Sequence, residues 1–187
     1  LQECLINAIE VSPHDKATAY IATTRYKFND HTPGLYKTTD YGKTWVKITN
    51  GIPYNAFTRV VREDEQRKDL LFAGTELGLF VSWNGGKEWS AFQLNLPITP
   101  ITDLKIHKGD LIAATSGRSF WILDDIGLFR QFKKSIDSFT VFQPEDTYLV
   151  NAYSELNQSN PDFDGTSKYN GVNPATGVVL YYHLPDL

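Results

Sequence analysis

An eight-residue pattern occurs twice in this chain of 187 residues, each time in strand-like surroundings. The pattern has a hydroxyl residue first, Asp or Asn third, Gly fifth and Trp eighth, at Thr38–Trp45 and again at Ser82–Trp89. Trp89 follows Trp45 by 44 residues. A repeat of about 40–50 residues built from short strands is typical of one blade of a β-propeller. The repeat therefore predicts an all-β chain of four-stranded antiparallel blades.

The strands of these blades can be placed from alternating apolar and polar residues and from the turn residues between them. No stretch shows convincing helical periodicity. The first blade is expected to contain strands at 6–11, 19–24, 34–38 and 46–49, with a polar insertion at 25–33. The second repeats the order at 58–61, 70–75, 79–82 and 90–93, and a third begins with 102–106, 111–115 and 119–123.

The third copy of the pattern is degenerate. Asp125 and Gly127 keep the acidic and glycine positions, but Arg130 stands where Trp would be. A degenerate copy is typical of a terminal repeat. The predicted organisation is therefore a partial propeller of three blades, a linker or mobile loop, and a truncated further β-domain. The boundaries are about 5–51, 52–96 and 97–132 for the blades, 133–150 for exit strands, 151–177 for the linker, and 178–187 for the first strand of the further domain.

That last strand, at 178–184, is expected to have no partner of its own, since three residues follow it. Because three blades cannot close a ring, the remaining blades of the parent chain are expected partners, and exposed edge strands favour self-association. Leu1 and the absence of Met indicate a piece of a longer polypeptide.

Composition excludes several classes of protein. The net charge of -4 argues against nucleic acid or an anionic membrane as the main partner. No apolar run is long enough to span a membrane, and Cys4, the single cysteine, cannot form an intrachain disulfide. The histidines have no metal-ligand spacing, and Asn160–Gly165 opens like a calcium loop but has Gly171 where the bidentate Glu belongs. No metal or cofactor is expected.

The repeated pattern has a physical explanation in each of its positions. Glycine tolerates the positive φ of a tight hairpin, the Asp or Asn side chain accepts hydrogen bonds from turn amides, and the Trp ring buries apolar area against a neighbouring sheet. We therefore assign structural roles to these positions, namely Thr38, Asp40, Gly42, Thr44, Trp45, Ser82, Asn84, Gly86, Trp89, Asp125 and Gly127.

The first copy, Thr38–Trp45, resembles the Asp-box, or bacterial neuraminidase repeat, of sialidases, xyloglucanases and sortilin-type propellers. Ala113–Asp125 resembles the last blades of bacterial sortilin-like propeller proteins, many of which are labelled glycosyl hydrolases. Asn173–Tyr182 resembles the entry to the Ig-like domain that follows such propellers. The resemblance implies a secreted or periplasmic protein, with the cytoplasm not excluded. It does not specify an activity, since the box occurs in enzymes and binders alike.

Antiparallel strands place the boxes and the first-to-second-strand turns at one end of each blade, which we call the box end. The second-to-third-strand turns and the links between blades lie at the opposite end, the loop end. Ligands of propellers usually enter beside loops at one end of the central channel. The binding residues predicted on this basis at the loop end are Arg25, Tyr26, His31, Tyr54, Glu76 and Arg118.

Two functions follow, from different classes. The first is a non-catalytic extracytoplasmic binding or scaffold segment that recognises protein or glycan. The second is a fragment of a sialidase- or xyloglucanase-like glycoside hydrolase with most catalytic groups elsewhere. A glycosidase needs two carboxylates about 5–10 Å apart. Glu76 and Asp103 are the candidates, but the sequence does not pair them, and the Arg-Ile-Pro signature of sialidases is absent.

Overall fold

The structure is a computed structural model, and it describes residues 3–132, 138–144, 146–147 and 177–185. The chain divides into two compact units, Leu1–Ile126 and Gly127–Leu187, each of which is described by itself. The predicted linker at 151–177 lies outside the described residues apart from Gly177, as do most of the strand expected at 147–150 and the calcium-like loop.

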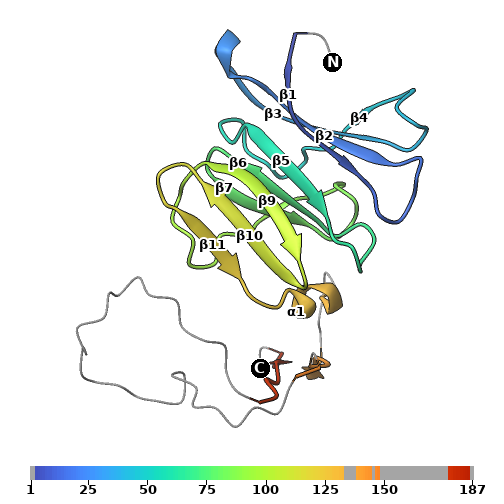
Figure 1. The fold of residues 1–187 in the computed structure, drawn as a ribbon, viewed down its shortest axis with the longest axis vertical. Coiled ribbons are helices and arrows are strands. Elements are labelled where there is room, and N and C mark those ends of the chain that lie inside the picture. Colours follow the sequence, from blue (N-terminus) through green and yellow to red (C-terminus); the bar gives the residue numbers. More distant parts are fainter. Residues whose placement is uncertain (1–2, 133–137, 145, 148–176, 186–187) are drawn as a thin grey trace. The chain divides into compact units, whose positions relative to one another are not determined.

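The first unit contains three antiparallel sheets that follow one another in chain order (Figure 1). Each sheet is formed by consecutive strands, so each is one blade, and the all-β prediction is confirmed. The first is β1 (Leu5–Val11), β2 (Ala19–Arg25), β3 (Asp30–Thr38) and β4 (Val46–Lys47); the second is β5 (Thr58–Glu63), β6 (Leu71–Thr75), β7 (Gly78–Ser82) and β8 (Ser90–Ala91); the third is β9 (Ile101–His107), β10 (Asp110–Thr115) and β11 (Phe120–Leu123).

The third blade differs from the expected four strands, because its described part has three. Leu123 stands where Thr38 and Ser82 supply a hydroxyl in the earlier boxes, so no side chain can hold the turn in the same way. The chain passes through Asp125 at a φ of 51° and enters a short helix, α1 (Gly127–Gln131), in place of a fourth strand. No helical periodicity marks these residues, since a helix of five residues is too short to show a period.

The second unit contains α1 and a small two-stranded antiparallel sheet. Its strands are β12 (Thr140–Val141) and β13 (Tyr182–His183), with Thr140 opposite His183. The expectation that the strand at 178–184 lacks a partner is therefore wrong. Its partner precedes it by about 40 residues, and local patterning cannot reveal such a distant pairing.

The first box forms a closed set of hydrogen bonds at the box end of the first blade. The Asp40 carboxylate accepts from the backbone N–H of Thr44 at 2.9 Å and from the Thr44 hydroxyl at 2.6 Å. The Thr38 hydroxyl donates to Asp40 at 2.8 Å and accepts from the backbone N–H of Gly42 at 2.9 Å. These bonds fix the β3–β4 hairpin, in which Gly42 has a φ of 81°.

The second box repeats this arrangement, and its tryptophan crosses to the preceding blade. The Ser82 hydroxyl donates to Asn84 and accepts from the backbone N–H of Gly86, as Thr38 does with Asp40 and Gly42. Trp89 is buried, and its ring N–H donates to the backbone carbonyl of Ile48 at 2.7 Å. The equivalent Trp45 donates to Gly42 within its own turn and is only half-buried. Of the two boxes, therefore, the second connects neighbouring blades in the described part of the chain.

The apolar core lies between the faces of successive blades. Tyr20, Ala22 and Leu35 of the first blade pack with residues of the second in one buried cluster. The second blade lies so close to the third that a Cβ on Gly74 would come within 2.7 Å of an Ile101 side-chain carbon. The members contributed by the second blade and the link before it are Ile52, Ala56, Val61, Leu71, Ala73, Phe80 and Trp89.

Asp40 gives a testable pH dependence. Its hydrogen bonds, chiefly the one from the Thr44 hydroxyl, lower the pKa of this carboxyl to about 2 from a usual value of 3.8. A lowered folded-state pKa stabilises the fold above pH 3.8, and this contribution is lost as the pH falls toward 2. Asp40→Asn should therefore lower the Tm above about pH 4, and the two melting temperatures should converge near pH 2.

Asn is a suitable replacement because Asn84 already occupies this position in the second box. A constant difference in Tm between the two proteins from pH 2 to pH 7 would contradict this account.

Candidate functional site

At the loop end, four side chains from two blades gather at the buried ring of Phe57 (5% exposed). Tyr26 of the 3-10 helix η1 (Tyr26–Phe28) stacks on it, with ring centroids 5.5 Å apart and an angle of 16° between the planes. His31 of β3 meets the ring edge-on at 5.6 Å. We call Tyr26, His31, Phe57, Arg59 and Glu76 the Phe57 cluster.

Arg59 and Glu76 complete this cluster from the second blade. The Arg59 guanidinium lies 5.2 Å from the centre of the Phe57 ring, which is a cation–π contact. Its Nη2 and Nε donate to one Glu76 oxygen at 2.6 and 2.9 Å, and both side chains are about one-third exposed. The backbone N–H of Glu76 also donates to the Phe57 carbonyl. The β6–β7 turn is therefore held against the link that enters β5.

Three aromatic side chains are exposed at the loop end. Tyr26 keeps 42% of its surface exposed, Phe28 keeps 61%, and Tyr54 in the link keeps 63%. Asn29, at a φ of 58°, ends η1, and an ion pair of 3.4 Å between Arg25 and Asp30 closes the loop. The polar insertion expected at 25–33 is thus a folded element that holds Tyr26 in place.

Asp30, at the start of β3, holds the end of that loop in place. The Thr32 hydroxyl and the Thr32 backbone N–H both donate to its carboxylate, and these bonds hold the pKa of Asp30 below its usual value. An ionised, hydrogen-bonded carboxylate restricts Arg25 and the start of β3.

Of the predicted binding residues, Tyr26, His31 and Glu76 meet in the Phe57 cluster, and Arg25 adjoins it in sequence. Arg118 lies in the β10–β11 turn of the third blade, where its backbone N–H donates to the Thr115 hydroxyl and its side chain is exposed. The two candidate catalytic carboxylates are held by different arginines, Glu76 by Arg59 and Asp103 by Arg62.

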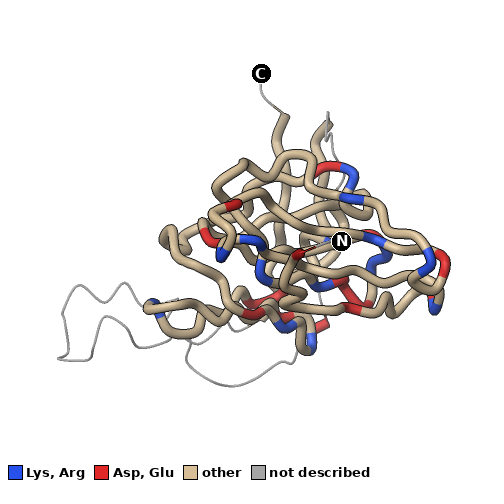
Figure 2. Tube along the Cα trace, turned by 90° about the horizontal axis from the view of Figure 1, so that it is seen from above, with Lys and Arg blue, Asp and Glu red and all other residues tan. Residues whose placement is uncertain are grey.

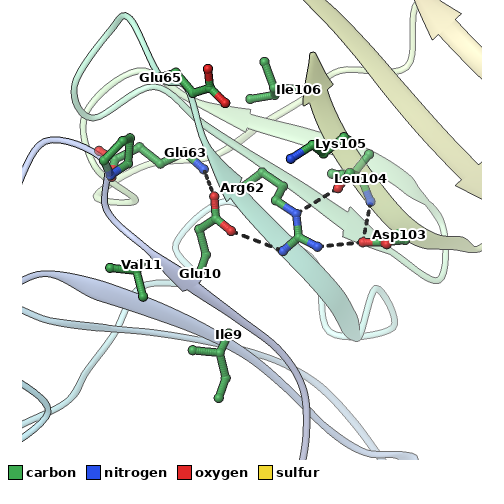
Figure 3. Close-up of a pocket in the computed structure, with 11 residues that line it drawn as sticks. Ile9, Glu10, Val11, Arg62, Glu63, Glu65, Asp103, Leu104, Lys105 and Ile106 are labelled. Carbon is green, nitrogen blue, oxygen red and sulfur yellow. Dashed lines mark hydrogen bonds and ion pairs between the residues drawn. The ribbon is translucent and has the colours of Figure 1, made fainter.

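A cavity of about 550 Å³ lies along the innermost strands β1, β5 and β9 (Figure 3). Arg62 of β5 lies at its centre and contacts both neighbouring blades. The guanidinium donates to Asp103 at 2.7 Å and to the Leu104 carbonyl at 2.8 Å in the third blade. It also donates to Glu10 of the first blade at 3.4 Å. Arg62 thus connects three blades with one side chain.

Glu10 is a carboxyl group beside this cavity whose pKa is shifted. Burial raises its pKa, and the nearby Arg62 opposes that effect. Asp103, by contrast, is 64% exposed. Two carboxylates in different environments thus lie on either side of one guanidinium, which occupies the space between them.

Charges in the described part of the chain are mixed rather than segregated (Figure 2). Among these residues no three His, Cys, Asp or Glu side chains come together as metal ligands would. None of the helices in the described ranges is long and apolar enough to cross a membrane.

Comparison with known proteins gives similarity of fold. The chain matches a GH74 enzyme of Niastella koreensis with a TM-score of 0.51 and 18% identity, over 76% of this chain and 24% of that one. It matches an ancestral GH74 enzyme with a TM-score of 0.49 and 22% identity, over 60% of this chain and 14% of that one. It matches YCF48 bound to D1 peptide with a TM-score of 0.47 and 17% identity, over 65% of this chain and 37% of that one. This chain therefore spans well under half the length of each.

No family model matches the chain, and no curated protein matches it. The three successive sheets and the likeness to the Niastella enzyme define the described part of the first unit as a partial β-propeller.

The residues at the centre of the Phe57 cluster and of the cavity around Arg62 were not predicted from the sequence. Phe57 and Arg59 were not singled out because their partners lie in a different blade or a later turn. Glu10 and Arg62 were missed for the same reason, being 52 residues apart. A signal was present for Arg62, since it directly follows Val60 and Val61 in an expected strand, and a charged residue that is partly buried there needs a partner.

Arg62→Ala should lower the free energy of unfolding by about 2 kcal/mol, because charge-assisted hydrogen bonds to two blades are lost. Arg62→Lys should recover only part of this, since one ammonium cannot reproduce a planar fork with several donors. Urea unfolding measures both. The matched control is Arg118→Ala at an exposed turn, which should change stability by less than about 0.5 kcal/mol. Identical unfolding curves for Arg62→Ala and the unsubstituted protein would exclude the bridging role.

Proposed function

We propose that this propeller segment binds a protein or glycan ligand at the loop end without hydrolysing it. The observation that carries the proposal is the Phe57 cluster, which fixes Tyr26 by ring stacking while 42% of its surface stays exposed. A rigid exposed aromatic offers contact area at low cost in side-chain entropy. Sugar rings and peptide side chains both pack on such a surface.

The neighbouring aromatics enlarge this surface. Phe28 and Tyr54 are more than 60% exposed, and they lie in the same loop and link as Tyr26 and Phe57. Exposed large aromatics are enriched in binding sites because they remove apolar area from water when a ligand covers them. The ion pairs Arg25–Asp30 and Arg59–Glu76 supply a polar rim.

The alternative is a glycoside hydrolase fragment, and one observation favours it. Glu10, with its raised pKa, and Asp103 line one cavity, as an acid and a base of a glycosidase would. Arg62, however, lies between them and is hydrogen-bonded to both. A sugar would have to displace this side chain, so binding without hydrolysis is the better-supported function.

The expected partners follow from the same features. Besides a protein or glycan ligand, the partial propeller has the remaining blades of a longer parent protein as partners. We propose an extracytoplasmic location, secreted or periplasmic, for a protein of this kind.

The proposal is tested by titrating the chain with xyloglucan oligosaccharides and with an immobilised peptide library, and measuring Kd by calorimetry for any hit. Tyr26→Ala and Tyr54→Ala should each weaken binding by about tenfold or more, as truncation of a central aromatic contact does. Tyr41→Ala is the matched control, since Tyr41 is 76% exposed but lies in the first box.

Equal losses in the Tyr41 and Tyr26 variants would remove the loop end as the site. Hydrolysis is assayed in parallel with xyloglucan and sialyllactose as probes. Release of reducing sugar by the unsubstituted chain, abolished in Asp103→Ala, would overturn the binding proposal in favour of the glycosidase.

A further inference from the structure

A groove of about 420 Å³ lies at the box end, between the boxes of the first and second blades. It shares no residue with the Phe57 cluster or with the cavity around Arg62. Both of its walls belong to blades of the first unit. We call it the box groove, and the lining residues that could contact a ligand are Lys37, Thr39, Val46, Asp69, Asn84 and Lys87.

An ion pair between the two blades lies in this groove. The Lys37 Nζ is 3.2 Å from Asp69 Oδ1, and it also lies 5.3 Å from the centre of the Tyr20 ring. Asp69 is held at a φ of 66°, because its backbone N–H donates to Glu63 and its carbonyl accepts from the backbone N–H of Gly85. The Lys37 side chain is 21% exposed and that of Asp69 is 40% exposed. The pair is therefore fixed in place and still accessible to a ligand.

A repeated backbone hydrogen bond shows which positions are equivalent in the three blades. In each blade the box turn donates an N–H to the carbonyl of the turn between the first and second strands. The three bonds run from Tyr41 to Ala17, from Gly85 to Asp69 and from Ile126 to Gly109. Gly109 is therefore equivalent to Asp69, and Ile126 to Gly85. Lys37 is equivalent to Val81, since each directly precedes the hydroxyl residue of its box.

The contact between the second and third blades forms without such an ion pair, because its equivalent residues are Val81 and Gly109. Ile126, which is fully buried, also stands where the first contact has Gly85. A Cβ on Gly85 would come within 2.4 Å of Asp69 Oδ1 and 3.0 Å of Lys37 Nζ, so the ion pair requires this glycine. Replacing buried ion pairs by apolar residues is often neutral or stabilising. The packing of blades therefore does not explain the pair or the groove beside it.

Several donors at the groove have no hydrogen-bond or ion-pair partner among the described residues. They are the Thr39 hydroxyl, the Asn84 side-chain NH2 and the Lys87 ammonium. The orientation of the Asn84 amide is fixed, since its Oδ1 accepts from the Ser82 hydroxyl and from the backbone N–H of Glu88. These donors are available to a ligand.

We propose that the box groove binds a saccharide that carries a carboxylate, as a uronic acid does. Sugar hydroxyls both donate and accept, and the pair of Lys37 and Asp69 presents a donor and an acceptor side by side. Val46, which is 64% exposed, offers apolar surface to the C–H groups of a sugar ring. Lys87 leaves one positive charge unbalanced in the groove, and a carboxylate would neutralise it through a charge-assisted hydrogen bond.

A phosphate group fits this groove less well. Phosphate sites are commonly built from backbone N–H groups. Those of Gly85 and Gly86 are already bonded, to the Asp69 carbonyl and to the Ser82 hydroxyl.

The groove is also preformed. The Trp89 ring N–H donates to the carbonyl of Ile48, and the Asp40 carboxylate accepts two hydrogen bonds from Thr44. Ile48 and Thr44 both line the groove, so contacts within the chain hold its walls. A preformed site loses less conformational entropy when a ligand binds. The inference does not depend on binding at the loop end, so the two can fail separately.

The test is calorimetric titration of the complete chain with short oligosaccharides of galacturonic, glucuronic and mannuronic acid, and with the corresponding neutral sugars. An acidic oligosaccharide should bind at least tenfold more tightly than its neutral counterpart. Lys87→Ala should weaken its binding by about tenfold or more, because a charge-assisted hydrogen bond is lost. The double variant Lys37→Val with Asp69→Gly copies the contact between the second and third blades, so it should fold and fail to bind.

Lys43→Ala is the matched control. Lys43 has the same position in the first box as Lys87 in the second, but it does not line the groove. Its removal should change the Kd by less than about twofold, because a distant exposed charge is screened by salt. Failure of every acidic oligosaccharide to bind would overturn the proposal, as would equal affinity for the neutral sugars. Equal losses in the Lys43 and Lys87 variants would also overturn it, and so would unchanged binding by the double variant. Circular dichroism checks that each variant folds.

Discussion

Arg62 lies on the innermost strand of the middle blade, where its guanidinium contacts both neighbouring blades. It donates to Glu10 on one side and to Asp103 and the Leu104 carbonyl on the other. Behind it, the apolar faces of successive sheets pack together, from Tyr20 and Leu35 to Val61 and Phe80. A sheet with two apolar faces cannot remain folded alone in water, because each face must be covered. The structure therefore depends on contacts between blades more than on any single blade.

The same dependence separates the two ends of the molecule. At the box end, Asp40 and Asn84 satisfy the amides of tight turns, and Trp89 reaches back to Ile48 in the preceding blade. The hydrogen bonds of these side chains hold the turns and the contact between blades. At the loop end, the connections differ between blades, and the first has an insertion that positions Tyr26 on Phe57. These connections can vary without disturbing the hairpins at the box end.

The sequence predicted the elements that depend on local chemistry. The box spacing identified the hairpins, and period-two alternation located the strands of three blades to within a few residues, with β3 starting earlier, at Asp30. Contacts between distant residues could not be predicted, among them the Arg62 bridge and the pairing of β12 with β13. The absence of a fourth strand from the described part of the third blade had a local sign in Leu123 and Arg130, but the helix α1 had none. For the candidate site, residue types at the loop end were predicted, whereas the central Phe57 was not.

Hydrogen exchange followed by mass spectrometry tests most directly whether neighbouring blades stabilise one another. The middle blade is covered on both faces, so the amides of β6 and β7 should exchange most slowly. Those of β2 and β10, the central strands of the first and third blades, should exchange faster, because among the three sheets of the first unit each of these packs against the middle one only. Equal protection of all three blades would contradict the account, because each blade would then be stable without its neighbours.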